Sequence, residues 1–544
     1  MILKLIRIEQ TCKKWIKNNG FSYFLLTLVC VLSECSFVLF MWILGKYFEF
    51  LQTNSKIILF SYRITISGLY MIICLLLITY IASSIIFKHL NFKLSNKNMI
   101  FLESQVLERL LDKKYESICY RNKIELAQQI NNDCVIVSDF IIEKIPTLLV
   151  KTFKLILLLV LLSTISFEIF VTVLLTNLLF VILYLITRKR YKELNIILNE
   201  KRMNYFGVLG GELLNIFLVK VNVWNKKTIS KFDKVGDEFV ESSVKFLNID
   251  NIINNMFFMI STIMSIIVPF VYIRTREKII YLIIVIFIIN IYYPTCDCIF
   301  QIIKNFSVFD NAKIRINRLF KLEDEKIGLT KLKESISQIK STNLIYKYEA
   351  ADKPIIRDFD FNLKKGKLYL VKGENGSGKS TFLKILMGIL YSEDTKFYVN
   401  NIPSSEIDFK FLRKERISYC EQEPYIITGT FKENILYNSS MKDLDKYREF
   451  VTNLFDHLKI KEDTILYETN LSGGEKQKIS ILRTLYKDAD MYIFDEPTAS
   501  LDFQSGKRLK KIIEELLKEN KLVIIISHDD TFDDLTTEII EFSK

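Results

Sequence analysis

A glycine-rich stretch that begins at Gly373 has the residue types and the spacing that could bind phosphate. It reads GENGSGKS and keeps the spacing G-x-x-x-x-G-K-S up to Ser380. Glycines let backbone N–H groups converge on phosphate oxygens without a Cβ clash. A lysine at the position of Lys379 supplies positive charge to the β- and γ-phosphates, and the hydroxyl group of Ser380 suits Mg²⁺. The stretch therefore predicts a site for ATP and Mg²⁺.

The residues on either side of these glycines supply the elements that must position them. KLYLV, before the glycines, is a short apolar run typical of a buried strand, and KSTFLKILMGIL, after them, has the apolar spacing of a helix. A helix that begins at the glycines adds the positive end of its dipole to the site. We predict nucleotide contacts for Gly373, Asn375, Gly376, Ser377, Gly378, Lys379, Ser380 and Thr381.

Two adjacent carboxylates follow a second predicted strand, in the segment MYIFDEPTAS. Asp495 suits the Mg²⁺ shell, either directly or through water. Glu496 is placed to polarise the attacking water, which is the role of a general base. A carboxylate after a strand can also simply cap a helix, but a phosphate-binding loop about 115 residues upstream favours the catalytic interpretation.

The segment LSGGE, residues 471–475, starts another predicted helix, whose N-cap is Ser472. It resembles the signature of the ABC ATPases, and the chain is identified as a member of that family. The resemblance implies that Ser472, Gly473 and Gly474 contact the γ-phosphate of ATP bound to an opposing ATPase domain. With one such domain in the chain, the resemblance implies a dimer with a second half-transporter, either a homodimer or a heterodimer.

Four further residues match the motifs of the family in order along the chain. Gln422, within YCEQEPYIITGTFKENIL, resembles the glutamine that contacts Mg²⁺ or water, and Asp502 matches a loop that crosses the dimer interface. His528 follows the strand KLVIIIS and resembles the histidine that contacts the γ-phosphate. Tyr348 matches the aromatic residue that stacks on adenine, with Tyr346 as a close competitor. The resemblance implies Glu496, His528 and Gln422 as catalytic residues, and Ser380, Gln422 and Asp495 as metal ligands.

The first 320 residues carry nearly all the long apolar runs of the chain. A membrane-spanning helix needs about 20 mostly apolar residues, because a helix rises about 1.5 Å per residue across about 30 Å of hydrocarbon. Six segments meet this requirement: about 21–45, 64–87, 145–166, 168–187, 252–273 and 279–300.

The charge of the connecting loops predicts the orientation of these spans. The long connections 88–144 and 188–250 hold nine and twelve Lys and Arg residues, whereas the short ones at 46–63, 163–167 and 274–278 hold three, none and three. Positively charged loops stay on the cytoplasmic side. We therefore predict a multi-pass protein of the cell membrane, typical of a bacterial plasma membrane, with both termini and the ATPase domain in the cytoplasm.

Both long connections have helical periodicity and few Gly or Pro residues, which predicts membrane helices that continue into the cytoplasm. Loop 88–144 contains ELAQQINNDCVIVSDFI, with the pair Asn132 and Asp133, and loop 188–250 contains GGELLNIFLVKVNVWNKKTISKFDKV. These segments resemble the cytoplasmic loops of the exporter-type ABC transmembrane domain, whose second loop docks a short transverse helix on an ATPase domain. A generic helical hairpin has the same composition.

The predicted fold class is an all-α six-helix transmembrane domain with long cytoplasmic helical extensions, followed by an α/β P-loop ABC ATPase domain. The predicted order is an amphipathic helix at 1–20, the transmembrane domain at 21–320, a linker at 321–340 and the ABC nucleotide-binding domain at 341–544. The net charge is +12, but the basic residues are scattered between apolar runs, so we predict no nucleic-acid partner.

Together these features predict an ATP-hydrolysing exporter that moves a peptide or an amphipathic small molecule out of the cytoplasm, with membrane lipid as its surroundings. A lipid flippase or a multidrug exporter is the alternative, and an ATP-gated channel or regulator is a third. Glu34 and Asp297 are ionisable residues within predicted spans, and such residues commonly face a cavity. The sequence leaves open whether they contact substrate.

Overall fold

The structure is a computed structural model of the 544-residue chain. It describes residues 8–53, 58–59, 62–63, 65–274, 279–349, 351–391, 396–436, 463–467 and 470–542. The chain forms two compact units. Unit 1 comprises Met1–Lys113 and Tyr120–Leu322, and unit 2 comprises Lys114–Cys119 and Glu323–Lys544.

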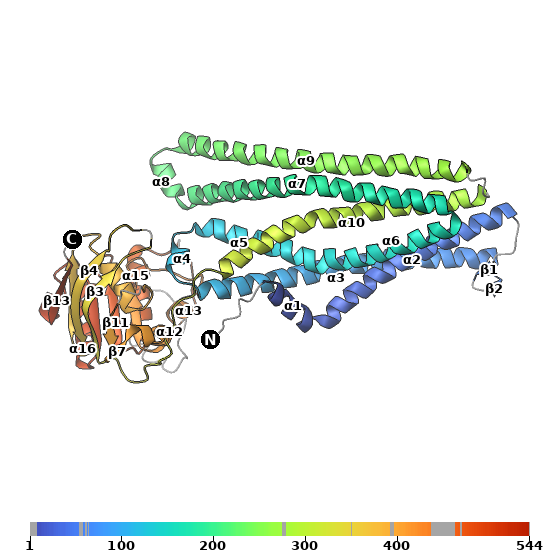
Figure 1. The fold of residues 1–544 in the computed structure, drawn as a ribbon. Helices are drawn as coiled ribbons and strands as arrows, with labels where there is room; N and C mark the ends of the chain where they lie inside the picture. Colours follow the sequence, from blue (N-terminus) through green and yellow to red (C-terminus); the bar gives the residue numbers. More distant parts are fainter. Residues whose placement is uncertain are drawn as a thin grey trace. The chain divides into compact units, whose positions relative to one another are not determined.

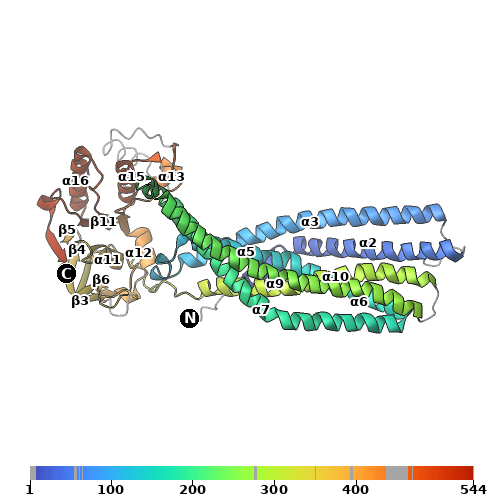
Figure 2. The same ribbon diagram turned by 90° about the horizontal axis from the view of Figure 1, so that it is seen from above.

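Unit 1 is built from long helices that run side by side (Figures 1 and 2). Six helices of the described chain are long and apolar enough to cross a membrane. In order, the helices of unit 1 are α1 (Ile8–Asn18), α2 (Gly20–Thr53), α3 (Ile66–Leu111), α5 (Lys123–Asp139), the π-helix η1 (Phe140–Lys144), α6 (Ile145–Ile165), α7 (Phe167–Leu214), α8 (Ile216–Val221), α9 (Asn225–Arg274) and α10 (Ile279–Phe320).

The lengths of these helices confirm the predicted fold class, in which the membrane helices have long extensions. Helices α3, α7 and α9 have 46, 48 and 50 residues. At about 1.5 Å per residue each is about 70 Å long, more than twice the thickness of the hydrocarbon. Each therefore extends well beyond the membrane. The third and fourth spans meet at Ser166, whose extended backbone ends α6 and starts α7, within the predicted connection.

The N-terminal helix α1 is amphipathic, and its apolar face packs inside unit 1. Ile8, Cys12 and Trp15, spaced by one helical turn each, are buried, while Lys13 and Lys14 are exposed. Residues 1–7 of the predicted 1–20 segment lie outside the described residues.

Unit 2 contains a five-stranded sheet of order β13-β5-β12-β11-β8, in which every neighbouring pair is parallel. A second, antiparallel sheet has the order β4-β3-β6-β7, and β9 pairs with β10. The strands are β3 (Gln338–Tyr346), β4 (Ile356–Lys364), β5 (Leu368–Gly373), β6 (Tyr398–Val399), β7 (Ile402–Pro403), β8 (Ile417–Cys420), β9 (Gly429–Thr430), β10 (Ile465–Leu466), β11 (Met491–Asp495), β12 (Leu522–Ile526) and β13 (Glu538–Phe542). The helices are α4 (Glu116–Cys119), α11 (Lys379–Leu386), α12 (Phe409–Glu415), α13 (Phe431–Leu436), α15 (Gly473–Tyr486) and α16 (Phe503–Lys518).

The parallel sheet is buried on both faces, which explains why its middle strand β12 is apolar at every position. Alternate residues of a strand point to opposite faces. Ile493 and Ile524 pack in a core with the side chains of α11, whereas Phe494 and Ile525 pack in a separate core with α15 and α16. Helix α11 therefore covers one face of the sheet, and α15 and α16 cover the other.

The structure corrects two of the predicted boundaries. In the predicted linker at 321–340, Leu332 and Ile336 are buried in the core of unit 2, and β3 already begins at Gln338. These apolar residues follow no helix or strand period, so the sequence did not mark them as core. Residues Lys114–Cys119 of the first long connection also belong to unit 2, where the Lys114 side chain is paired with Glu349.

One buried ion pair joins two cytoplasmic extensions in unit 1. Asp133 on α5 is 1% exposed and accepts hydrogen bonds from Arg315 on α10, at 2.9 Å and 3.1 Å from Nε and 2.5 Å from Nη2. The carboxylate and guanidinium groups thus face each other in the forked geometry typical of strong pairs. A buried charge that loses its partner is strongly destabilising.

We predict that Asp133→Ala destabilises the chain by about 3–5 kcal/mol, because Arg315 then keeps an uncompensated charge. The double variant Asp133→Ala with Arg315→Met should recover part of this loss. Melting temperature in detergent measures both. The exposed pair of Lys201 and Glu238, 2.8 Å apart, is the control, and Lys201→Met should leave the melting temperature close to that of the wild type. Equal losses at the two pairs would contradict this account.

Candidate functional site

The predicted phosphate-binding loop connects β5 to α11 through backbone conformations that favour glycine. Gly376 and Gly378 have φ values of 81° and 106°, and Gly373 has a φ of 150°. A Cβ atom on Gly373 would lie 2.4 Å from the carbonyl oxygen of Phe542. Glycine at these positions is therefore required by the loop itself, which is why the spacing was so informative in the sequence.

The polar groups of this loop suit the phosphates of a nucleotide. Lys379 is 8% exposed, and its ammonium group donates to the carbonyl oxygens of Gly373 and Glu374, at 2.6 Å and 3.0 Å. The Ser377 hydroxyl is buried and has no hydrogen-bond partner among the described residues. A buried hydroxyl without a partner costs free energy, so an incoming phosphate oxygen would satisfy it. The residues present fit ATP, with Ser380 next to the lysine to hold Mg²⁺.

The parallel sheet brings the other predicted residues to the same edge. In parallel strands the carboxyl ends lie on one side, where α/β proteins bind their ligands. His528 follows β12, Asp495 ends β11 with Glu496 directly after it, and Gln422 follows β8. This is the sheet order that starts from the phosphate loop on β5. Neighbouring strands are about 4.8 Å apart, so this edge spans only a short distance.

Asp495 is 3% exposed and lies at the end of the strand β11. Burial raises the pKa of Asp495 and the charge of Glu496 raises it further, against a hydrogen bond from Tyr419 and the charges of Lys384 and Lys379. The Tyr419 hydroxyl donates to the carboxylate over 3.4 Å. A buried carboxylate at this edge is a suitable ligand for a divalent cation, whose charge would stabilise its ionised form.

Glu496 and His528 face each other across adjacent strands. The His528 Nε2 atom is 3.5 Å from Oε1 of Glu496. Glu496 has a positive φ of 49°, which is unfavourable for a residue with a side chain and tends to occur at functional sites. Its amide donates to the carbonyl oxygen of Ile526 over 2.9 Å, which fixes this conformation to β12.

One residue of this region that the sequence did not single out is Asp529, next to the histidine. It accepts hydrogen bonds from the hydroxyl groups of Ser527 and Thr498, at 2.9 Å and 2.7 Å, and from the amide of Thr531 at 3.1 Å. Burial alone raises the pKa of Asp529, but these hydrogen bonds outweigh it and the net pKa is lowered. Asp529 thereby ties the loop of His528 to the loop after Glu496.

The signature segment forms the predicted helix start. Ser472 is the N-cap of α15 and forms both bonds of a capping box with Glu475, at 3.3 Å and 2.8 Å, so the predicted cap is confirmed. A Cβ atom on Gly474 would lie 2.8 Å from the carbonyl oxygen of Ser500, so the two loops touch backbone to backbone. Gly473 beside it is exposed.

The carboxylate of Asp502 forms its hydrogen bonds and its ion pair within unit 2. It caps α16 by accepting from the amide and the hydroxyl group of Ser505, both at 2.8 Å, and it lies 3.0 Å from the Lys478 ammonium. The hydrogen bonds from Ser505 hold the pKa of Asp502 well below its usual value. A nucleotide contact by this side chain would have to compete with its cap.

The structure separates the two candidate adenine-binding tyrosines. Tyr346 is fully buried in the core, whereas Tyr348 is half-buried and its hydroxyl lies 3.0 Å from the Thr381 hydroxyl, just after the phosphate loop. The structure thus brings Tyr348 to the phosphate loop. It does not bring the signature to the P-loop helix, because α15 and α11 cover opposite faces of the sheet.

Of the two ionisable residues in predicted spans, Glu34 is the more strongly paired. It forms ion pairs with Lys151 at 2.5 Å and Lys154 at 2.7 Å, both on α6. Asp297 on α10 accepts a weaker hydrogen bond, 3.4 Å long, from Gln301 one turn further along the helix.

A nucleotide site of this kind, joined to six apolar helices, defines an ATP-driven membrane transporter. Residues 23–293 match the family model of the ABC transporter transmembrane region, and residues 356–499 match that of the ABC transporter. The chain belongs to the ABC transporters. It is a multi-pass membrane protein, and its ATPase domain is cytoplasmic.

Two curated relatives match about two fifths of this chain, whereas a solved structure matches nearly all of it. A putative ABC transporter ATP-binding protein of Clostridium tetani is 33% identical over 39% of this chain and 48% of that protein. ATP-dependent lipid A-core flippase 2 of Colwellia psychrerythraea is 28% identical over 43% of this chain and 41% of that protein, so the chain spans less than half of either relative. A solved bacterial Atm1-family ABC exporter with ATP bound has a TM-score of 0.84 over 97% of this chain and 95% of that one. At 15% identity, that likeness shows a shared fold.

We predict that Gly373→Ala weakens ATP binding by roughly tenfold to hundredfold, because the new methyl group must displace the carbonyl of Phe542. Titration of the purified protein with a fluorescent ATP analogue measures the affinity. The matched control is Gly211→Ala on α7, where an added Cβ meets nothing within 4 Å. Wild-type affinity in Gly373→Ala would mean that this loop does not hold the nucleotide.

Proposed function

We propose that the chain is an ATP-hydrolysing exporter that works as a dimer and moves a peptide or an amphipathic small molecule out of the cytoplasm. The observation that carries this proposal is the single sheet edge that holds the phosphate loop, His528, the carboxylates of Asp495 and Glu496, and Gln422.

In this proposal each residue at the sheet edge has a separate role in ATP hydrolysis. Lys379 binds the β- and γ-phosphates, and Ser380, Asp495 and Gln422 hold Mg²⁺, which when bound would neutralise the phosphate charge. Glu496 orients the attacking water and accepts its proton, since it follows β11 at the same sheet edge as the phosphate loop, with only β12 between β11 and β5. His528, 3.5 Å from that carboxylate, orients Glu496 and contacts the γ-phosphate.

The arrangement of unit 2 supports a head-to-tail dimer. The exposed N-terminus of α15 presents Ser472 and Gly473 with the positive end of a helix dipole, which favours an anion. The phosphate loop belongs to a helix on the opposite face of the sheet. A second copy, or a related half-transporter, can supply the signature that each phosphate loop requires.

For the substrate, similarity to a lipid A-core flippase favours one alternative, a lipid flippase. A multidrug exporter remains a variant of the same mechanism. An ATP-gated channel or regulator fits less well, because Glu496 and His528 keep the arrangement that hydrolysis needs.

We predict that Glu496→Gln lowers ATP turnover by roughly 10²–10⁴-fold and leaves ATP binding intact, because only proton transfer is removed. ATPase assays in proteoliposomes, with nucleotide binding measured in parallel, provide the test. Glu515→Gln on the exposed side of α16 is the matched control and should turn over ATP like the wild type. Unchanged turnover in Glu496→Gln would contradict the assignment of Glu496 as the general base.

We also predict that two inactive variants, Lys379→Ala and Ser472→Arg, recover activity when they form a mixed dimer. In that dimer one composite site carries both changes, and the other has an intact phosphate loop and an intact signature. Co-expression with two different affinity tags allows the mixed dimer to be isolated. Turnover should reach about half the wild-type rate if the two sites act independently. A mixed dimer as inactive as its parents would indicate sites completed within one chain.

A further inference from the structure

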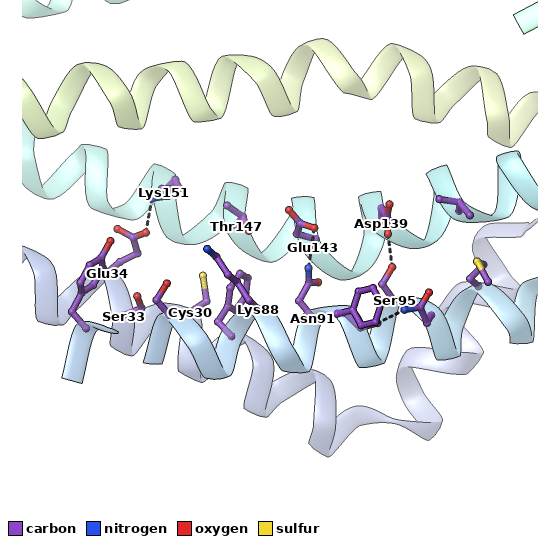
Figure 3. Close-up of a pocket in the computed structure, with 17 residues that line it drawn as sticks. Cys30, Ser33, Glu34, Lys88, Asn91, Ser95, Asp139, Glu143, Thr147 and Lys151 are labelled. Carbon is purple, nitrogen blue, oxygen red and sulfur yellow. Dashed lines mark hydrogen bonds and ion pairs between the residues drawn. The ribbon is translucent and has the colours of Figure 1, made fainter. Parts of the chain in front are cut away.

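Unit 1 contains a polar cavity of about 780 Å³ between α2, α3 and the continuous helix formed by α5, η1 and α6 (Figure 3). This volume lies within the usual range for ligand sites, about 300–1,000 Å³. One wall is a stripe of side chains spaced by four residues on the continuous helix: Val135, Asp139, Glu143, Thr147 and Lys151. The facing wall comes from α3, and Cys30, Ser33 and Glu34 of α2 complete the lining.

Two buried polar atoms in the lining have no hydrogen-bond partner among the described residues: Oγ1 of Thr147 and Oδ1 of Asn91. Elsewhere in α6, Thr152 donates to the carbonyl oxygen of Leu148 over 2.7 Å, as a threonine in a helix commonly does. Thr147 lies just after the π-helix η1, and π-helices are frequent at functional sites. Unpaired buried polar atoms are costly, so the cavity is suited to a polar occupant.

The two ends of the cavity carry opposite charge. At one end Glu34 is shared by Lys151 and Lys154, at 2.5 Å and 2.7 Å, and Lys88 points into the same region in Figure 3. Lys88 has no ion pair or hydrogen bond in the part of the chain that the structure describes. Three ammonium groups and one carboxylate thus lie at this end, which leaves an excess of positive charge.

At the other end the lining is acidic. Asp139 accepts a hydrogen bond from the neutral hydroxyl of Ser95, and Glu143 accepts from the amide of Asn91 at 2.9 Å (Figure 3). Lys144 is the cation paired with Glu143, at 2.8 Å. Two carboxylates with one ammonium group leave an excess of negative charge here.

The separation of the two ends sets the length of a matching ligand. Glu143 and Lys151 are eight residues apart on the helix, and Asp139 and Lys151 are twelve apart. At about 1.5 Å per residue these separations are about 12 Å and 18 Å. An extended peptide covers about 3.3–3.6 Å per residue, so three to five residues reach from one end to the other.

We propose that this cavity binds a short zwitterionic peptide, with its carboxylate at Lys88 and Lys151 and its amino group at Glu143 and Asp139. The assignment rests on the proposed export function and names its substrate class. A lipid fits the cavity less well, because eleven of the 17 lining residues are polar or charged and charged groups lie at both ends. The polar residues are Ser33, Glu34, Ser84, Lys88, Asn91, Ser95, Asn96, Asp139, Glu143, Thr147 and Lys151.

Equilibrium dialysis of radiolabelled tetraalanine against the full chain in lipid nanodiscs, without nucleotide, tests this proposal. Tetraalanine has only its two terminal charges, so its C-terminal amide and its N-acetyl form each remove one of them. We expect the free peptide to bind about tenfold more tightly than either blocked form, because each loses a charged partner. Equal binding of the three peptides, or no binding, would overturn the proposal.

Three variants assign the two ends. Lys88→Met should abolish the preference for the free carboxylate and keep the preference for the free amino group, and Glu143→Gln should do the reverse. Lys93→Met, on the exposed side of the same α3 helix and outside the cavity lining, should bind all three peptides like the wild type. A loss of preference in Lys93→Met equal to that in Lys88→Met would contradict the assigned site.

A second measurement separates this proposal from the export function on which it rests. In nanodiscs with and without phosphatidylglycerol, ATP turnover sensitive to Glu496→Gln reports on export chemistry independently of dialysis. If turnover responds to phosphatidylglycerol and tetraalanine does not bind, the proposed peptide site is wrong and the proposed export function still stands. If the peptides bind with the expected charge preference but turnover does not depend on Glu496, the peptide site is supported and the proposed function is contradicted.

Discussion

The chemistry of this chain depends on one constraint, which is that parallel strands end on the same side of a sheet. The phosphate loop, the Asp495–Glu496 pair, His528 and Gln422 come from segments spread over more than 150 residues, and the sheet places each at a strand end. The strands that carry them are buried on both faces, so these ends are held by packed cores on two sides. Small loops can therefore hold catalytic groups without a large scaffold of their own.

The same sheet also separates the groups that must cooperate. Its alternating side chains assign α11 to one core and α15 to the other, so the helix after the phosphate loop and the signature helix cannot share a face. Asp502 adds to this arrangement, since its carboxylate caps α16 and contacts Lys478 next to the signature. This sheet geometry supports the proposed dimer, in which a second ATPase domain supplies the signature to each phosphate loop.

Local signals explain what could be predicted from sequence. The phosphate loop, the capping serine at 472 and the six apolar spans depend on spacing within one short segment, so they could be identified without a structure. Leu332 and Ile336 follow no regular period, and the linker was therefore assigned wrongly. The network around Asp529 needs Thr498 from another loop. The partners of Glu34 lie 117 and 120 residues away, on another helix, where no sequence pattern connects them.

The polar cavity also indicates how a ligand held at two ends could be released. Its positive end draws on α2, α3 and α6, and its negative end includes Glu143 within the π-helix η1. A zwitterion must be held at both ends at once, so a small shift of α3 along the continuous helix removes one partner and leaves a charge unpaired. Unpaired charges within a membrane domain are costly, so such a shift lowers affinity steeply. A π-helix is a suitable place for that shift, because rejoining a regular α-helix changes which residues share a face by one position.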